Sequence, residues 1–291
     1  QTIPSDDVDW VDEIMQTAQI QSYNVSLAKG DSKSQQMFSL GYFNQEGLIK
    51  YTGFERYSAR FNSSYNIGDF LTIGENFTAN YKEQVSVGTN AALGSVILTA
   101  MQFPSIVPVK DINGAYAGNP INDSNNPMGQ LSRNKDNKQK RVQALGNVFA
   151  NLYVGDFTFK TSFGLDYQNY NIRSFSPTYD EILSTNNTNS LSTSNSFNYQ
   201  FSFTNTLNYK KQFGKHHLDA ILGQESIEYN YEGFSASVSE FLYEDLNFRY
   251  LSFGTENMLN SGSANGWSLN SYFGRVNYNF DEKYLFTATV R

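Results

Sequence analysis

The sequence predicts an all-β chain that forms one segment of an antiparallel transmembrane β-barrel with long loops, and three observations lead to this fold class. Long stretches alternate between apolar and polar residues, as a strand with two different faces does. Aromatic residues make up 15% of the 291 residues, with 23 Phe and 20 Tyr. Short turns alternate along the chain with long polar connections, which is the layout of outer-membrane barrels.

The alternation is clearest in residues 197–204, where every odd position is aromatic and every even position is polar. Residues 157–168 and 56–65 show the same two-residue period. The polar face also carries charge, on Arg56, Arg60, Lys160, Asp166, Lys210 and Arg275. Strands of about 10 to 16 residues exceed the five or six that are usual in soluble sheets, and they suit a tilted crossing of a bilayer.

Ten strands are predicted, in pairs joined by short turns rich in glycine and aspartate, which favour turn conformations. They lie near 20–29, 35–46, 54–66, 70–83, 140–154, 157–170, 195–212, 216–231, 267–280 and 284–291. The long connections, at 84–139, 170–195 and 232–265, join the opposite strand ends. Residues 1–19 are expected to precede the barrel, and residues 20–291 to form one partial barrel domain.

Composition excludes several functional classes. A net charge of −7 argues against a nucleic-acid-binding protein, which needs a basic face. The absence of cysteine excludes disulfides and thiolate metal sites. No run of about 18 apolar residues is present, so no membrane-spanning helix is predicted. The chain has no basic and apolar leader at Gln1, so any export signal is expected to have been removed or to lie outside the sequence.

Neither catalysis nor a bound cofactor is expected. The only two histidines, His216 and His217, are adjacent in a turn, and neighbouring side chains on a strand point apart. An acidic run, which could in principle hold calcium, lacks the glycine and glutamate spacing of an EF-hand loop. Its members are Asp6, Asp7, Asp9, Asp12 and Glu13. Nothing resembles a nucleophile beside its base, or paired carboxylates in a pocket.

Short motifs along nearly the whole chain resemble, in family order, the barrel of SusC/RagA-type TonB-dependent transporters from the outer membrane of Bacteroidetes. These motifs are Asp9-Trp10, Asp12-Glu13-Ile14, Tyr23-Asn24-Val25-Ser26, residues 38–47, Phe54-Glu55-Arg56-Tyr57, Gln102-Phe103-Pro104, Val107-Pro108-Val109, Gly223-Gln224-Glu225, residues 274–278 and residues 283–291. The resemblance implies a 22-stranded barrel with an N-terminal plug domain and a TonB-contacting segment. Because neither the plug nor the remaining strands are found here, we expect the sequence to be a segment of a longer transporter.

The resemblance also implies a function and partners. The expected function is energy-dependent import of glycan or oligopeptide nutrients across the outer membrane, without chemistry on the substrate. The implied partners are a SusD-like surface lipoprotein that covers the barrel and the TonB complex, which acts through the absent N-terminal region. The barrel itself would contact outer-membrane lipid. No residue chooses between a glycan and a peptide substrate.

Two other functions remain open at this point. A passive porin would share the polar lumen and the long loops, although a porin would not carry the family motifs at residues 102–104 and 223–225. A β-rich surface adhesin would instead pack its apolar strand faces against each other. Dependence on detergent would distinguish an adhesin from either membrane protein.

The strand faces and the longest loop lead to specific expectations. We expect lipid contact for Phe157, Phe159, Phe163, Leu165, Phe197, Tyr199, Phe201 and Phe203, and a lumenal position for Lys160, Asp166, Gln200 and Thr204. A helix-like stretch, 90–101, ends before Pro104, because proline lacks a backbone donor. Its apolar residues are expected to be buried against barrel, plug or lid: Leu93, Val96, Ile97 and Met101.

Candidate substrate or lid contacts lie on the long loops, because loops carry binding residues disproportionately and carbohydrate sites combine aromatic and hydrogen-bonding groups. The first loop offers Tyr116, Asn119, Asn122, Asp123, Asn125 and Arg133; the second offers Tyr179, Asp180 and Glu181; and Trp267 stands at the predicted mouth of the ninth strand. For any single one of them, a solvated loop residue or a contact with a lid protein is the better explanation, and only as a group do they suggest a binding site.

Overall fold

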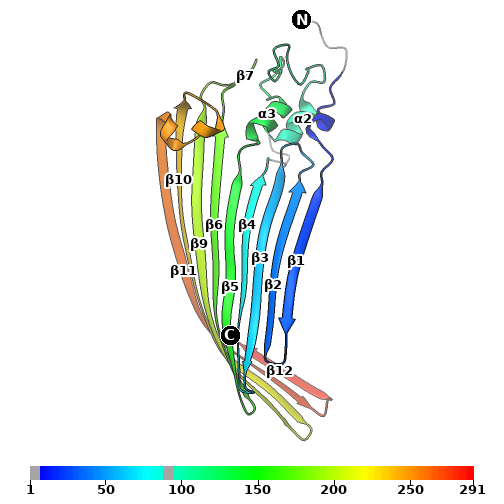
Figure 1. Cartoon of the computed structure of the whole chain (residues 1–291), viewed down its shortest axis with the longest axis vertical. Helices are drawn as coiled ribbons and strands as arrows, with labels where there is room; N and C mark the ends of the chain where they lie inside the picture. Colours follow the sequence, from blue (N-terminus) through cyan, green and yellow to red (C-terminus); the bar gives the residue numbers. More distant parts are fainter. Residues whose placement is uncertain (1–6, 88–94) are drawn as a thin grey trace.

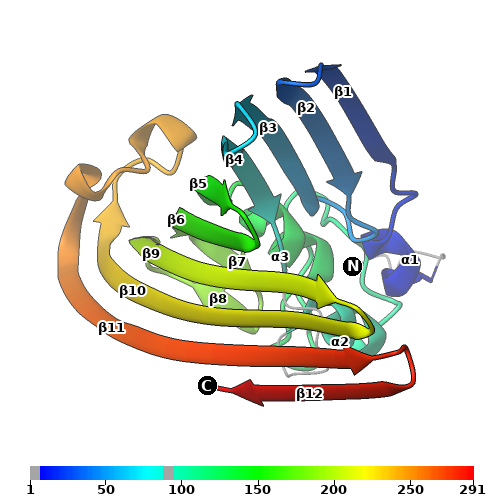
Figure 2. The same ribbon diagram turned by 90° about the horizontal axis from the view of Figure 1, so that it is seen from below.

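The computed structural model describes residues 7–87 and 95–291, and one ten-stranded sheet dominates it (Figure 1). The sheet is antiparallel, with its strands in the order β1-β2-β3-β4-β5-β6-β9-β10-β11-β12. The strands are β1 (Ile20–Gly30), β2 (Ser34–Glu46), β3 (Gly53–Ile67), β4 (Leu71–Val85), β5 (Gln139–Val154), β6 (Phe157–Ser176), β9 (Ser190–Phe213), β10 (His216–Phe241), β11 (Gly254–Phe280) and β12 (Tyr284–Val290). Seen from below, the sheet is an open, curved arc with β1 and β12 at its edges (Figure 2).

The two ends of the sheet differ in their connections. At one end, here called the turn end, five short turns of two or three residues join the strands. Gly68, Gly155 and Gly214 have positive φ in these turns, a conformation that glycine adopts without strain. At the other end, the loop end, the connections span 47–52, 86–138, 177–189 and 242–253. The predicted alternation of short turns and long loops is therefore confirmed.

The later strands extend further toward the loop end than the sequence predicts. β6 continues to Ser176, β9 begins at Ser190 and β10 continues to Phe241, so the connections predicted at 170–195 and 232–265 are too long. Pairing between β10 and β11 runs without interruption from His216↔Phe280 to Ser237↔Leu259. Backbone N–H and C=O groups can form the hydrogen bonds of a sheet whichever side chains the residues carry. These polar stretches therefore form strands although their sequence shows no apolar face.

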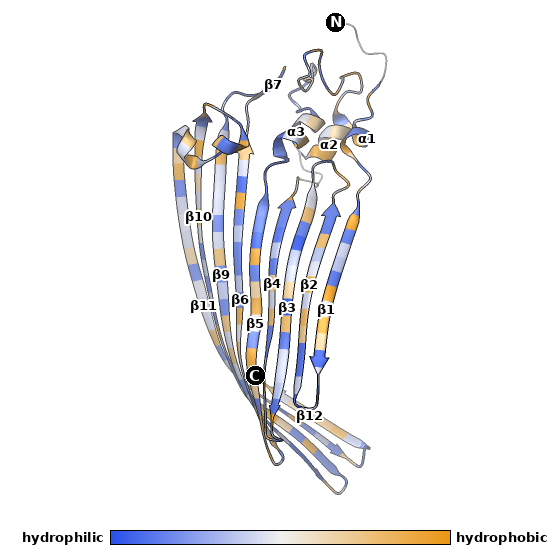
Figure 3. Ribbon diagram, in the orientation of Figure 1, coloured by the Kyte–Doolittle hydropathy of each residue, from blue (hydrophilic) through white to orange (hydrophobic). Residues whose placement is uncertain are grey.

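The register confirms the division of the strands into two faces. Phe163 pairs with Phe203, and Leu165 with Phe201, on what we call the apolar face. Asp166 pairs with Gln200 on the opposite, polar face. Hydrophobic and hydrophilic residues accordingly alternate along most strands (Figure 3). Direct contact of the apolar face with lipid stays a prediction.

A packed cap of loops and short helices covers the loop end beside β1–β5 (Figure 1). It consists of residues 8–14, 47–52 and 95–134, and it contains α1 (Trp10–Ile14), α2 (Val96–Gln102) and α3 (Pro127–Asn134). Its buried core is formed by Trp10, Ile14, Ile49, Val96, Ala100, Phe103, Val107, Ala117, Met128 and Leu131. The segment predicted merely to precede the barrel therefore contributes part of the core of this loop cap. None of the helices in the described residues is long and apolar enough to cross a membrane.

The expected burial of the apolar residues in the helix-like stretch is confirmed only in part. Val96 is buried and Ile97 packs on the core, but Met101 is 69% exposed, and Leu93 lies outside the described residues. α2 begins only after Ser95, which caps it, so its buried face carries Val96, Thr99 and Ala100, and Met101 points away from the core. The sequence reading also missed α3.

A smaller apolar cluster lies at the loop end of β6, β9 and β10. It joins Phe175, Leu191, Val238 and Phe241. Two 3-10 turns follow, η1 (Leu246–Phe248) and η2 (Leu251–Phe253), and the Arg249 guanidinium lies 4.4 Å from the centre of the Phe175 ring. Through this contact, the loop between β10 and β11 packs against the cluster at the ends of β6, β9 and β10.

Candidate functional site

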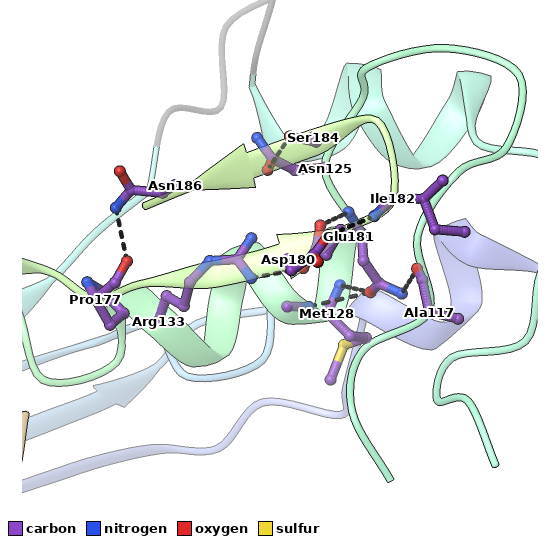
Figure 4. Close-up of polar contacts among 12 residues, drawn as sticks. Ala117, Asn125, Met128, Arg133, Pro177, Asp180, Glu181, Ile182, Ser184 and Asn186 are labelled. Carbon is purple, nitrogen blue, oxygen red and sulfur yellow. Dashed lines mark hydrogen bonds and ion pairs between the residues drawn. The ribbon is translucent and has the colours of Figure 1, made fainter. Parts of the chain in front are cut away.

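A buried carboxylate joins the first two long loops. Glu181 ends the short strand β7 (Tyr179–Glu181), which pairs with β8 (Ser184–Asn186), and it is 2% exposed. Its Oε1 accepts a hydrogen bond from Nη1 of Arg133 at 2.6 Å (Figure 4). Its Oε2 accepts one from the backbone N–H of Asn126 at 2.6 Å. The Arg133 guanidinium also lies 3.8 Å from the centre of the Tyr179 ring. Such charge-assisted bonds are the strong ones, so Glu181 clamps one loop onto the other.

Asn126 organises the first loop at this junction. It is the N-cap of α3, and its Oδ1 accepts hydrogen bonds from the N–H groups of Met128 and Gly129, at 3.0 and 3.1 Å. Its Nδ2 donates to the carbonyls of Val109 and Ala117, at 3.1 and 2.9 Å. Asparagine is a favoured N-cap residue, and Pro127 follows at the first helical position, where proline is common. The fully buried Asn126 side chain thus has partners for all its donors and its acceptor.

Further contacts complete the junction between the two loops. Asn119 forms a parallel bridge with Ile182, and the Ser184 hydroxyl donates to Oδ1 of Asn125 at 2.9 Å. A Cβ atom at Gly118 would lie 2.1 Å from the carbonyl oxygen of Glu181, so only glycine permits this approach. Ile182 has φ 68°, an uncommon conformation for a β-branched residue.

Most of the predicted contact residues are used within this junction. Asn119 is fully buried, and its Nδ2 donates to Asn122 Oδ1 and Ser124 Oγ, each at 2.8 Å. Asn122 also accepts from the N–H of Ser124 at 3.0 Å, so both asparagines shape the turn. Four more of the predicted residues make the contacts between the two loops that are given above: Arg133, Tyr179, Glu181 and Asn125. The structure therefore brings nine of the ten predicted residues into one region, but it gives several of them a structural role.

The remaining loop residues are more accessible. Tyr116 is half-buried against the core of the loop cap, with the Lys110 ammonium 5.6 Å from the centre of its ring. Asp123 is exposed, and Asp180 is exposed and accepts a hydrogen bond from the N–H of Ile182 at 3.1 Å. Contact of these residues with substrate or lid stays a prediction.

Trp267 lies elsewhere, and its predicted position at a strand mouth is wrong. β11 begins at Gly254, so Trp267 is well inside the strand, paired with Tyr229 of β10. The two rings stack with centroids 5.7 Å apart and an interplanar angle of 20°. The register places the pair on the polar face, because Tyr229 lies opposite Gln200 and Gln200 lies opposite Asp166.

Charged side chains elsewhere at the loop end also have partners within the structure. Lys138, at the end of the first long loop, donates to Oε1 of Glu83 at 2.5 Å, and this hydrogen bond raises the pKa of Lys138 above its ordinary value. Asp9, one of the acidic run near the start, caps α1 by accepting from the N–H groups of Val11 and Asp12. In residues 7–87 and 95–291, no three His, Asp or Glu side chains converge as metal ligands would.

The roles of two residues that organise the loops were not predicted from the sequence. Trp10 is 2% exposed, and its Nε1 donates to the Pro104 carbonyl at 3.1 Å while its ring meets Phe103 edge-on at 4.7 Å. The amphipathic pattern of residues 8–15 predicts the short helix around Trp10, but it does not predict that Trp10 packs on the first long loop. Asn126 followed by Pro127 is a sequence pattern typical of a helix N-terminus, and it could have predicted α3.

Comparison with known proteins supports the fold and the resemblance. No family model matches the sequence. TonB-dependent receptor P3 of Formosa agariphila is 29% identical over 294 residues, which cover 97% of this chain and 29% of that protein. TonB-dependent receptor SusC of Bacteroides thetaiotaomicron is 26% identical over 313 residues, covering 97% of this chain and 30% of SusC. The chain thus spans about 30% of the length of these relatives.

Comparison with solved structures gives the same fold and the same resemblance. The RagAB peptide transporter matches with a TM-score of 0.83 at 26% identity, over 98% of this chain and 33% of that one. The ferric citrate transporter FecA matches with a TM-score of 0.58 at 5% identity, over 91% of this chain and 33% of that one, which shows the fold alone. The resemblance to SusC/RagA-type TonB-dependent transporters is confirmed. The fold is that of a segment of an outer-membrane β-barrel.

Proposed function

We propose that these residues are part of the barrel of an outer-membrane transporter that imports glycan or oligopeptide nutrients under the control of TonB. One observation carries the proposal: 98% of the chain superimposes on the RagAB peptide transporter with a TM-score of 0.83. The strands alone do not make up 98% of the chain, so the match must include the loops as well as the sheet. The chemistry is binding and gated passage, and the substrate leaves unchanged.

The strand faces support this function. The apolar face would contact lipid, and the polar face would line the lumen, as barrels in the outer membrane require. The turn end would then be periplasmic and the loop end extracellular, because short turns lie on the periplasmic side of such barrels. The loop cap and the Glu181 junction would accordingly stand at the entrance.

A SusD-like lipoprotein is the partner that we propose for the loop end. Ile112, Ile121, Ile182 and Leu183 belong to the two joined loops, and their exposures are 102%, 68%, 59% and 53%. Large apolar side chains that stay exposed on two adjoining loops are a common feature of interaction sites. TonB itself would act through the plug region, which is outside this chain.

The test is the energy dependence of uptake. The whole transporter is expressed in a host with and without a functional TonB complex, and uptake of oligosaccharide and oligopeptide mixtures is followed by mass spectrometry. Import should cease when TonB is removed, while the protein still inserts in the membrane. Undiminished uptake without TonB would favour the passive porin and contradict the proposal.

A further inference from the structure

Three basic residues stand side by side on the polar face near the loop end. Arg56 of β3 pairs with Lys82 of β4, and Lys82 pairs with Arg141 of β5. Paired residues on one face have Cβ atoms about 4.5–5.5 Å apart, so the three charges form a compact basic row. Like charges directly opposite each other destabilise a sheet, so the sequence retains this row at a cost in stability.

The basic row has no carboxylate partner within the described part of the chain. None of its three residues takes part in an ion pair there. Arg141 donates to Oε1 of Gln168, but its buried Nε has no acceptor. Hydrogen bonds from Arg56 and Lys82 side chains are absent among the residues described. A guanidinium group carries five hydrogen-bond donors and an ammonium group three, so most of the donors in the basic row have no acceptor within the described part of the chain.

The two faces of this part of the sheet differ sharply in charge. The register puts no aspartate or glutamate of β1–β5 on the polar face. The carboxylates of these strands, Glu46, Glu55, Glu75 and Glu83, all belong to the apolar face. In a chain of net charge −7, this separation concentrates positive potential on the side that would line the lumen.

Aromatic rings flank the basic row. The Arg56 guanidinium lies 5.5 Å from the centre of the Phe43 ring, and the Arg141 guanidinium lies 4.6 Å from that of Tyr170. The stacked pair Tyr229 and Trp267 shares the same polar face. The lumenal wall thus combines unpaired cations with flat aromatic surfaces.

We propose that the basic row of Arg56, Lys82 and Arg141 binds the anionic groups of an acidic glycan fragment, carboxylates or sulfates, as it enters the lumen. This proposal rests on the proposed transport function and names its substrate class. Strand neighbours are about 4.8 Å apart, close to the length of one pyranose unit, whereas an extended peptide repeats side chains on one face about every 7 Å. A glycan charged at successive sugars therefore fits the spacing better than an acidic peptide does.

The experiment measures ligand affinity of the whole purified transporter in detergent by isothermal titration calorimetry. The probes are oligogalacturonate, sulfated carrageenan oligosaccharides, neutral maltoheptaose and oligoglutamate. The variant Lys82→Gln/Arg141→Gln removes two charges of the basic row. Its matched control, Lys160→Gln/Arg275→Gln, removes two cations of the same face near the turn end, and heat-modifiable migration verifies that each variant is folded.

The wild type should bind one of the two acidic oligosaccharides, with affinity that falls as salt rises. The variant of the basic row should bind at least tenfold more weakly, and the control should stay within twofold. Equal affinity of variant and wild type, tighter binding of maltoheptaose or oligoglutamate, or a lower unfolding temperature without any change in affinity would each overturn the proposal. TonB-dependent uptake that survives such a result would leave the transport function intact, so the two failures are distinguishable.

Discussion

The carboxylate of Glu181 and the guanidinium of Arg133 lie 2.6 Å apart although 48 residues separate them in the sequence. Their side chains are 2% and 16% exposed, so neither charge is well solvated. Removing one partner of a buried pair leaves an uncompensated charge, which costs far more than the pair itself contributes. The pair therefore controls whether the two loops stay joined.

The first prediction follows from this pair. Arg133→Met should leave the Glu181 carboxylate without its main partner and should destabilise the junction by about 3 kcal/mol. Amide hydrogen exchange in residues 113–134 should accelerate by about a hundredfold or more, because exchange reports local opening. Asp180→Asn, at the exposed neighbouring position, serves as the control and should leave exchange unchanged. Equal exchange in both variants would show that the pair is dispensable.

How far the sequence could predict the structure depends on the range of the interactions. Alternation is local, so strands such as β4 and β5 are predicted to within two residues at each end. Residues 190–196 contain mostly serine, threonine and asparagine, and only their pairing with β6 and β10 makes them a strand. The burial of Glu181 and Asn119 depends on partners from two loops, and no local pattern encodes it.

The second prediction concerns the two faces of β9. Phe201→Lys should impair membrane assembly, because a lysine on the lipid side costs about 2–4 kcal/mol near the bilayer midplane. Gln200→Lys places the same charge on the polar face and should assemble normally. The measurement is the fraction of heat-modifiable protein in outer-membrane fractions. Equal tolerance of both substitutions would contradict the barrel assignment.

The third prediction concerns backbone strain at the tip of the β7–β8 hairpin. Ile182 has φ 68° and is 59% exposed, so its side chain gains little from burial. Ile182→Gly should relieve the strain and stabilise the hairpin by about 1 kcal/mol, while it removes an apolar group that we propose contacts the lid. Hydrogen exchange in residues 179–186 should slow, and co-purification of the lipoprotein should fall. Faster exchange would mean that the isoleucine is not strained there.

The last prediction concerns the accessible part of the loop cap, and the variant that tests it must leave the buried core of the loop cap unchanged. Deleting 113–133 as a whole would remove Met128 and Leu131, which are 6% and 1% exposed, so the loop cap would lose its packing. Ile121→Ser/Asp123→Ser instead changes two exposed side chains of the same loop.

This double variant should insert normally and keep hydrogen exchange of α3 unchanged, because neither side chain has a role in the core. Growth on the imported nutrient and association with the lid lipoprotein should each fall by about fivefold, the loss of about 1 kcal/mol of binding free energy. Leu242→Ser/Asp245→Ser makes the matching change at exposed positions of the loop between β10 and β11, and it should behave as the wild type. Should both variants grow and bind the lid equally well, the tip of the first long loop would have no part in recognition, and the contact residues would have to lie on the lumenal wall.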